Sequence, residues 1–321
     1  MSARLSNPTT LSLVLSATLL TLACARTQTT ASQAAPLPPF EYIGEWGTKG
    51  DGPGELSQPE WLATDVAGNA YIADSGSGYI NKFAPQGHPL LSFRDGVPNH
   101  PFGVAVDRGG GIYVISPGVD SISIFKPEGE RIRTLPVRPT HRHQWPGNIV
   151  VDQDGNIYVI EVLGDSGRSQ IRKFSARGLL LKSWEMRPTA EGRPLTPASI
   201  AFGSDQTLYV VDFAGQAVQK FTREGDFMSG WFMPETTGEL DDRAYNAAGI
   251  GVTGNYVFVG DTESRGVIVW TVTGERKLMD DLGGRLHGSQ GKFQIVITLH
   301  GDLLVLDCQA ARVLRYKINL Q

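Results

Sequence analysis

The sequence predicts an all-β protein, a six-bladed β-propeller of four-stranded blades, because one short strand pattern returns six times along the chain. Each copy begins with Ile or Val and ends in an aromatic residue: Phe83, Phe125, Phe174, Phe221, Trp270 and Tyr316. Successive aromatic residues lie 42, 49, 47, 49 and 46 positions apart. A unit of about 40–50 residues that holds several short strands and repeats is the signature of a propeller blade.

A second signature, a short apolar strand, lies before the strand that ends in the aromatic residue in each copy. It ends at Asp74, Ser116, Glu161, Asp212, Asp261 and Asp307. In the first three copies an aspartate stands nine residues earlier, at Asp65, Asp107 and Asp152, in a turn rich in Gly and Asn. These signals predict an antiparallel meander of three strands.

A fourth, outer strand is expected after a glycine that follows the third strand. That glycine occurs in five copies, at Gly87, Gly129, Gly178, Gly225 and Gly274. Six residues further on come Phe93, Leu135, Trp184, Trp231 and, in the fifth copy, Asp280. The fifth outer strand therefore has the weakest signal.

Ring closure is predicted from the two ends of the repeat region, residues 40–321. The last copy stops after Tyr316 without an outer strand, whereas Glu41–Trp46 has outer-strand character and no partners of its own. We expect this segment to pair with the sixth blade, which would also hide exposed strand edges.

The repeated pattern resembles the NHL repeat family of six-bladed propellers. The resemblance rests on P-x-x-apolar-x-x-D-x-x-G-N-x-Y-V-x-[DE], then I-x-K-F and a glycine, clearest over Pro146–Gly178. It implies the fold, but this fold hosts lyases, lactonases, binding modules and RNA readers, so it does not imply one function.

The charge of the chain narrows the class of partner. Its formal net charge is −4 and its pI is about 5.9, without the basic stripe of a nucleic-acid binder. We therefore expect no nucleic-acid partner.

The N-terminal segment, residues 1–24, is predicted to be a lipoprotein signal peptide. Arg4 precedes a 13-residue apolar run, Leu11–Ala23, which is too short to span a bilayer. Thr21–Cys24 resembles a bacterial lipobox, although Thr21 departs from the usual leucine. Cys24 would then be lipidated and tether the protein to a lipid bilayer. Export without lipidation is the alternative.

Residues 25–39 are predicted to be a flexible tether that stiffens toward its prolines. The resemblance to lipoproteins implies the periplasmic side of an outer membrane or the cell surface. The second cysteine, Cys308, would have no partner within the chain, and we expect it to be a small buried residue.

Four long connections between blades are expected on one face of the propeller, and long loops are often functional. They are Leu135–Pro146, Met186–Pro197, Met228–Ala248 and Leu278–Phe293. A binding site at this mouth of the central channel is the default hypothesis.

Within this face, His100 and the pair Arg142 and His143 precede neighbouring blades. They suggest a site for an anion or a carbonyl group, or two ligands of a metal. The simpler interpretation is a solvated loop, since two histidines without a third ligand are weak support for a metal site.

The innermost strands begin at Trp61, Gly103, Asn148, Ser199, Gly249 and Gln294. Trp61 and Asn148 are candidates for stacking on a ligand and for polar contact with it, against ordinary packing as the alternative. The acidic series at the second-strand ends suggests either a cation such as calcium or, more simply, acceptors for loop N–H groups. Ser116 and Glu161 break that series, which makes blades two and three the predicted sector of the site.

Three functions compete on these observations. The favoured one is a monomeric module that is not an enzyme and that binds a small molecule, a glycan or an envelope protein. We expect no cofactor, with a calcium or zinc ion in the channel as the alternative. The alternative is a metal-dependent lyase or lactone hydrolase. The sequence has no G-x-S-x-G, H-E-x-x-H or P-loop motif. Nucleic-acid binding conflicts with export and with the charge.

Replacing Cys24 by serine should abolish lipidation, because serine offers no thiol for acylation. Metabolic labelling with a fatty acid should mark the wild-type protein and the control variant Cys308→Ser, but not Cys24→Ser. Globomycin should block processing of the wild type and of Cys308→Ser, whereas Cys24→Ser should not respond to it. Labelled Cys24→Ser protein would contradict the lipoprotein prediction.

Overall fold

The computed structural model of the protein describes residues 39–94, 100–116, 121–137, 148–163, 168–188, 190, 195–212, 217–232, 249–262, 264–286 and 292–320. The predicted signal peptide, residues 1–24, and the tether, apart from Pro39, lie outside them. None of the described segments is a helix with the length and apolarity needed to span a bilayer.

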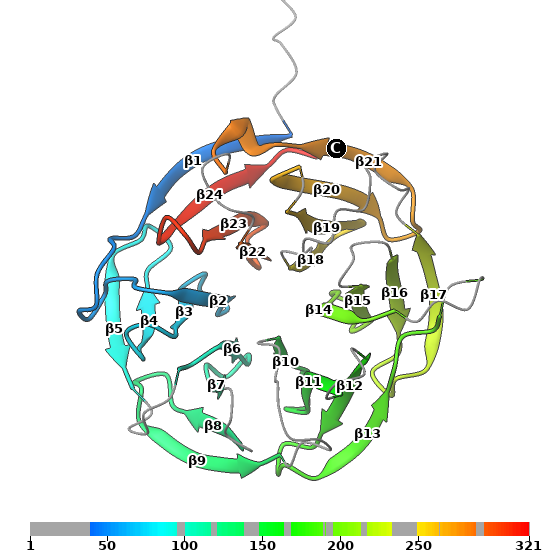
Figure 1. The fold of residues 1–321 in the computed structure, drawn as a ribbon, viewed down its shortest axis with the longest axis horizontal. Coiled ribbons are helices and arrows are strands. Elements are labelled where there is room, and N and C mark those ends of the chain that lie inside the picture. The colour runs from blue at the N-terminus through cyan, green and yellow to red at the C-terminus, as the bar shows by residue number, and fades with distance from the viewer. Residues whose placement is uncertain are drawn as a thin grey trace, which may run out of the picture. The chain divides into compact units, whose positions relative to one another are not determined.

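Six four-stranded antiparallel sheets surround a central axis, as Figure 1 shows, and this confirms the predicted fold class. In each sheet the strands follow one another from the axis outward. Blade one consists of β2 (Pro59–Thr64), β3 (Ala70–Asp74), β4 (Ile80–Phe83) and β5 (Pro89–Phe93). Blade two consists of β6 (Gly103–Val106), β7 (Ile112–Ile115), β8 (Ser121–Phe125) and β9 (Arg131–Pro136). Blade three consists of β10 (Ile149–Val151), β11 (Ile157–Leu163), β12 (Arg168–Phe174) and β13 (Leu180–Trp184).

Blades four and five repeat this order, and blade six takes its outer strand from the other end of the chain. Blade four consists of β14 (Pro197–Phe202), β15 (Leu208–Asp212), β16 (Ala217–Phe221) and β17 (Phe227–Phe232). Blade five consists of β18 (Ile250–Thr253), β19 (Tyr256–Asp261), β20 (Gly266–Thr271) and β21 (Arg276–Asp280). Blade six consists of β22 (Phe293–Ile297), β23 (Asp302–Asp307), β24 (Arg312–Ile318) and, as its outer strand, β1 (Phe40–Trp46). A short 3-10 turn, η2 (Leu282–Gly284), follows β21.

The predicted ring closure is confirmed. The antiparallel pair β1–β24 begins with Phe40 opposite Ile318 and ends with Trp46 opposite Val313. The outer strand of blade five is also present despite its weak signal, because Asp280 pairs with Val267 through the backbone. Backbone pairing tolerates an acidic side chain that stays partly exposed at the rim.

Apolar packing between neighbouring blades forms the core. Six clusters of buried residues hold the ring, one at each interface between blades. Along β11, Ile157 and Val159 pack with blade two, whereas Tyr158 and Ile160 pack with blade four. Successive side chains of a strand point to opposite faces, so both faces of a blade are buried. This explains why these strands read as continuous apolar runs.

The aspartate of the first turn organises that turn. Asp152 accepts hydrogen bonds from the backbone N–H groups of Asp154 (2.9 Å) and Asn156 (2.8 Å), and its second oxygen lies 3.0 Å from the Tyr158 hydroxyl. Asp65 and Asp107 make the same kinds of contact in blades one and two. Burial, followed by the charge of Asp107, raises the pKa of Tyr113 to about 12. The phenol therefore stays protonated and able to donate to the carboxylate.

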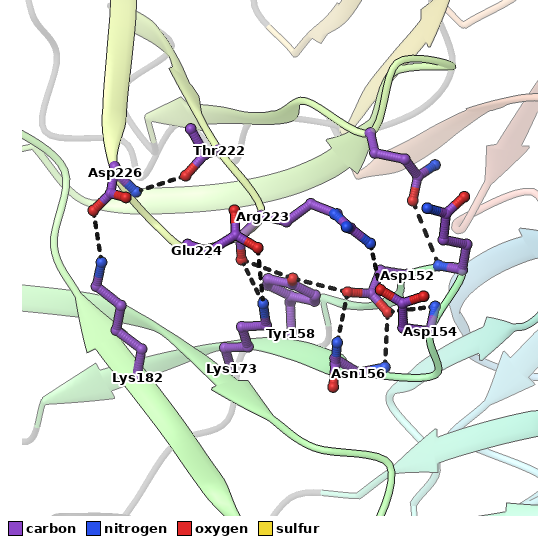
Figure 2. A network of polar contacts seen from close by, with 12 residues as sticks. Asp152, Asp154, Asn156, Tyr158, Lys173, Lys182, Thr222, Arg223, Glu224 and Asp226 are labelled. Carbon is purple, nitrogen blue, oxygen red and sulfur yellow. Dashed lines mark hydrogen bonds and ion pairs between the residues drawn. The ribbon is translucent and has the colours of Figure 1, made fainter.

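A basic residue of the third strand joins each of three blades to the next one. Figure 2 shows the case of blades three and four, where Nζ of Lys173 donates to the Arg223 carbonyl oxygen at 2.8 Å. The Tyr158 hydroxyl lies 2.9 Å from the same oxygen. Equivalent bonds run from Lys220 to the Val272 carbonyl (3.3 Å) and from Arg315 to the Pro85 carbonyl (3.0 Å). The lysine of the repeated I-x-K-F pattern thus contributes to the contact between blades.

The glycine after the third strand is required by a close approach. It lies under the outer-strand side chain of the preceding blade in the pairs Gly87–Trp46, Gly129–Phe93, Gly178–Leu135, Gly225–Trp184 and Gly274–Trp231. A Cβ atom on Gly225 would lie 2.7 Å from the Trp184 ring, and its φ of +80° disfavours other residues as well.

Gly225→Ala should therefore destabilise the protein by about 2–4 kcal/mol, through backbone strain plus overpacking against Trp184. Gly301→Ala is the matched control, because Gly301 has a φ of +82° and open space where its Cβ would lie. The control should cost only about 1 kcal/mol. The free energy of unfolding in urea measures both. Equal losses would show that the approach of Trp184 does not constrain Gly225.

Candidate functional site

The innermost strands enclose a cavity of about 440 Å³ on the axis of the propeller. Every blade lines it. Asp65, Asp107 and Arg108 line it just beyond the ends of the innermost strands, and apolar side chains form more than half of the wall, among them Trp61, Val106, Val151, Ala201, Val252 and Val296. All six innermost strands lead from an outer strand to a second strand, so they begin at the same end of the channel. We call this end the strand-start mouth. Trp61, Asn148 and Ser199 line the cavity here, and Glu60, Lys292 and Gln294 lie at the starts of the innermost strands beside it.

A polar pair lies at this mouth between blades three and four. Asn148 is 1% exposed, and its Nδ2 donates to Oγ of Ser199, 2.6 Å away and itself 2% exposed. Oδ1 of Asn148 has no hydrogen-bond partner among the described residues, yet both residues line the cavity. A buried amide oxygen left without a partner costs about 1–3 kcal/mol, so this group is available for a ligand.

A second amide lies at the same mouth in blade six. Oε1 of Gln294 also lacks a partner within the described part of the chain. A Cβ atom on Gly249, the strand-start residue of blade five, would lie 3.0 Å from this oxygen. The glycine therefore leaves room for the Gln294 side chain.

An ion pair spans blades six and one at the strand-start mouth. Glu60 is 8% exposed and lies at a β-bulge of β2, where the register shifts between Pro59 and Trp61. Nζ of Lys292 donates to Oε2 of Glu60, and the Ser75 hydroxyl donates to Oε1 at 2.8 Å. Bulges often redirect a side chain next to functional sites. Here the bulge turns a carboxylate toward a neighbouring blade.

The predicted residue His100 joins this cluster from blade two. Its Nδ1 lies 2.7 Å from the Ser75 carbonyl oxygen. Because a carbonyl only accepts, Nδ1 carries the proton, and Nε2 of the neutral ring is left as an acceptor. The Lys292 ammonium lies 5.8 Å from the centroid of the Phe102 ring, so blades six, one and two meet here.

The prediction that Cys308 is a buried free thiol is confirmed. Its backbone N–H donates to the Lys292 carbonyl oxygen at 3.2 Å, directly behind the ion pair. Burial raises the pKa of the Cys308 thiol to about 12, so it stays protonated and packs as a small apolar group.

Glu161 lies in a different environment from the one its position suggested. It is 1% exposed, accepts a bond from Nε2 of Gln170 at 2.6 Å, and lies 3.5 Å from Nη1 of Arg172. It does not line the cavity. Its carboxylate is thus engaged within blade three.

The aspartates of the acidic series bind the backbone, as the simpler interpretation held. Asp74 accepts bonds from the N–H groups of Ser57, Gln58, Gly76 and Ser77, at 2.6 to 3.1 Å. Asp212, Asp261 and Asp307 each accept at least one loop N–H bond. Among the described residues, no three His, Cys, Asp or Glu side chains gather closely enough to hold a metal ion.

Two predicted site residues, Arg142 and His143, lie outside the described residues. The predicted approach of His143 to His100 therefore stays a prediction. Sequence reasoning missed Glu60 and Lys292. Glu60 directly precedes the expected strand start Trp61, and Lys292 lies two residues before the expected start Gln294; this placement was the available signal.

No family model matches the chain, and no curated protein matches it. Solved propellers do. Catalytically inactive virginiamycin B lyase from Staphylococcus aureus with quinupristin is 13% identical over 83% of each chain, with a TM-score of 0.59. The PQQ-bound aldose sugar dehydrogenase from Streptomyces coelicolor is 14% identical over 89% of this chain and all of its own, with a TM-score of 0.59.

A chain of the nidogen–laminin complex is 17% identical over 69% of this chain and 79% of its own, with a TM-score of 0.54. Identities this low show the fold alone. The three neighbours comprise a lyase, a dehydrogenase and a protein in a complex, so binding and enzymatic roles are both compatible with the fold.

Lys292→Met should destabilise the protein by about 2 kcal/mol, because it leaves the buried Glu60 carboxylate without its cation. The double variant Glu60→Gln/Lys292→Met should recover most of this loss. Lys182→Met is the control, since Lys182 pairs with Asp226 on the exposed surface at 2.9 Å. It should cost less than about 1 kcal/mol.

Urea unfolding at neutral pH measures these differences. If the double variant were as unstable as Lys292→Met, the loss would not come from an unpaired carboxylate.

Proposed function

We propose that the protein is a binding module that holds a small molecule in its central channel at the strand-start mouth. The observation that carries the proposal is the Asn148 amide, which is buried at the edge of a cavity of about 440 Å³ and has an oxygen without a partner among the described residues. A buried polar group of this kind usually has a water or ligand partner.

The form of the cavity supports this role. Its volume falls within the range of about 300–1,000 Å³ that is usual for small-molecule sites. Apolar walls with a few fixed polar groups are also typical of such sites. Asn148 and Ser199 line the cavity where the innermost strands begin, and the Glu60–Lys292 pair lies beside Trp61 at the same mouth, so we expect the polar part of a ligand to bind here.

The NHL type, the export and the lipid anchor in this proposal are supported by the sequence. The six motif copies support an NHL-type propeller, and the apolar run followed by Thr21–Cys24 supports export and a lipid anchor at Cys24. On this basis the module acts at the periplasmic side of an outer membrane or at the cell surface. A glycan or an envelope protein at the same face is the related alternative.

An enzymatic role is the second candidate, as a lyase or lactone hydrolase with its site at the same mouth. The observation in its favour is His100, whose Nδ1 binds the carbonyl of Ser75, the residue whose hydroxyl donates to Glu60, so that Nε2 is left as an acceptor. Such a nitrogen can act as a general base. Turnover that depends on His100 would favour this role over binding alone.

Asn148→Leu should weaken ligand binding about tenfold or more, because the amide oxygen can no longer accept a bond from the ligand. A screen of small molecules by ligand-observed NMR, followed by calorimetry on the purified chain, supplies the affinities. Asn255→Leu is the matched control, since Asn255 is exposed in the turn between β18 and β19.

Ligands that bind Asn148→Leu and the wild type equally would place binding outside the channel mouth. A screen in which no ligand responds to Asn148→Leu would contradict the proposed function.

A further inference from the structure

We propose that the ligand of this mouth is a neutral molecule with several hydroxyl groups, of the saccharide or polyol class. The inference rests on the proposed channel site and specifies its ligand. It follows from the way in which donors and acceptors alternate around the strand-start mouth.

The first donor–acceptor pair is Asn148 with Ser199. Oδ1 of Asn148 is an acceptor without a described partner. The Ser199 oxygen already accepts from Nδ2 of Asn148, so its own hydroxyl proton is left to donate. One acceptor and one donor are thus fixed side by side, on a pair of side chains joined by a bond of 2.6 Å.

The second pair is Glu60 with Lys292. Each carboxylate oxygen accepts one bond, from Ser75 or from Lys292, and keeps a further lone pair. The ammonium of Lys292 has three N–H groups and donates one of them to Glu60. The Lys292 side chain is 50% exposed, so the remaining donors face outward.

A hydroxyl group fits both pairs because its oxygen donates and accepts at one atom. A ligand carboxylate only accepts, so it would satisfy Ser199 or Lys292 but would face the oxygens of Asn148 or Glu60. A ligand ammonium only donates and would fail at Ser199 and Lys292. Two separate pairs require at least two hydroxyl groups.

The charges of the Glu60–Lys292 pair also favour a neutral ligand. Glu60 and Lys292 neutralise each other, so the pair offers no net charge to an ion. At this mouth a charged ligand would lose its hydration without gaining an unpaired counter-charge, because the charged residues that line the cavity, Asp65, Asp107 and Arg108, lie at the opposite ends of the innermost strands.

Trp61 supplies the apolar contact that such a ligand needs. It follows Glu60 directly in β2, lines the cavity and is half-buried against the core between blades one and two. A cyclic polyol has C–H groups on its ring faces, which can pack on an indole while its hydroxyl groups reach the polar pairs at the rim.

The test is calorimetry on the purified full chain with D-glucose, D-galactose, D-mannose and their disaccharides. D-gluconate serves as the carboxylate analogue, and acetamide and propionamide serve as primary amides, which also combine donor and acceptor. At least one neutral sugar should bind, and Lys292→Met, Asn148→Leu and Trp61→Ala should each weaken it about tenfold. Lys182→Met should bind as the wild type does.

Preferential binding of gluconate or of the amides would overturn the ligand class. So would sugar binding that is unchanged in Lys292→Met and Asn148→Leu. If apolar compounds alone bind and depend on Asn148, the class is wrong while the channel still binds ligands. If no compound of any class depends on Asn148, both proposals fail. The double variant Glu60→Gln/Lys292→Met, which keeps an uncharged acceptor, separates loss of binding from loss of stability.

Discussion

The structure depends on burying both faces of every blade against its neighbours. A lone four-stranded sheet of this sequence would expose residues such as Val159 and Ile160, which are fully buried on opposite sides of β11. The ring solves this by placing each blade between two others. The outer-strand side chain of one blade covers a glycine of the next, as Trp184 covers Gly225. A small change in side-chain volume at one of these contacts therefore disturbs the packing between two blades rather than the packing within one sheet.

The same arrangement creates the candidate site. Blades that pack face to face around an axis cannot also fill the axis itself, so the innermost strands enclose a cavity. Residues that begin these strands come from distant parts of the sequence but gather at one mouth. The Glu60–Lys292 contact joins residues 232 positions apart. The propeller thus brings together single polar residues that have no neighbours of similar character in the sequence.

The repeat made most of the fold predictable. Aromatic spacing, turn aspartates and glycines gave the six blades, and the unpaired Glu41–Trp46 segment gave the ring closure. Of the candidate site, the strand-start positions Trp61 and Asn148 were predicted, and both line the cavity. Glu161 was singled out because it departs from the pattern, but a buried arginine beside it accounts for that departure.

The Glu60–Lys292 pair could not be predicted in the same way. Neither residue belongs to the repeated pattern, and their contact depends on which blades become neighbours when the ring closes. The bulge at Glu60 adds a shift of register that strand periodicity does not show. Periodic signals specify the elements that all blades share, whereas the site is built from residues that differ between blades.

Closure by β1 also bears on the order in which the chain can fold. The strand that comes first in the propeller pairs with the one that comes last, and Arg312 donates to Glu45 across 267 residues of sequence at 2.9 Å. A chain that emerges from its N-terminus has no partner for β1 until β24 has appeared. The early blades can pack on one another in the meantime, since those contacts are short in sequence. The last step is then the closing of a very long loop, and until it occurs β1 and β24 both present open strand edges to other chains.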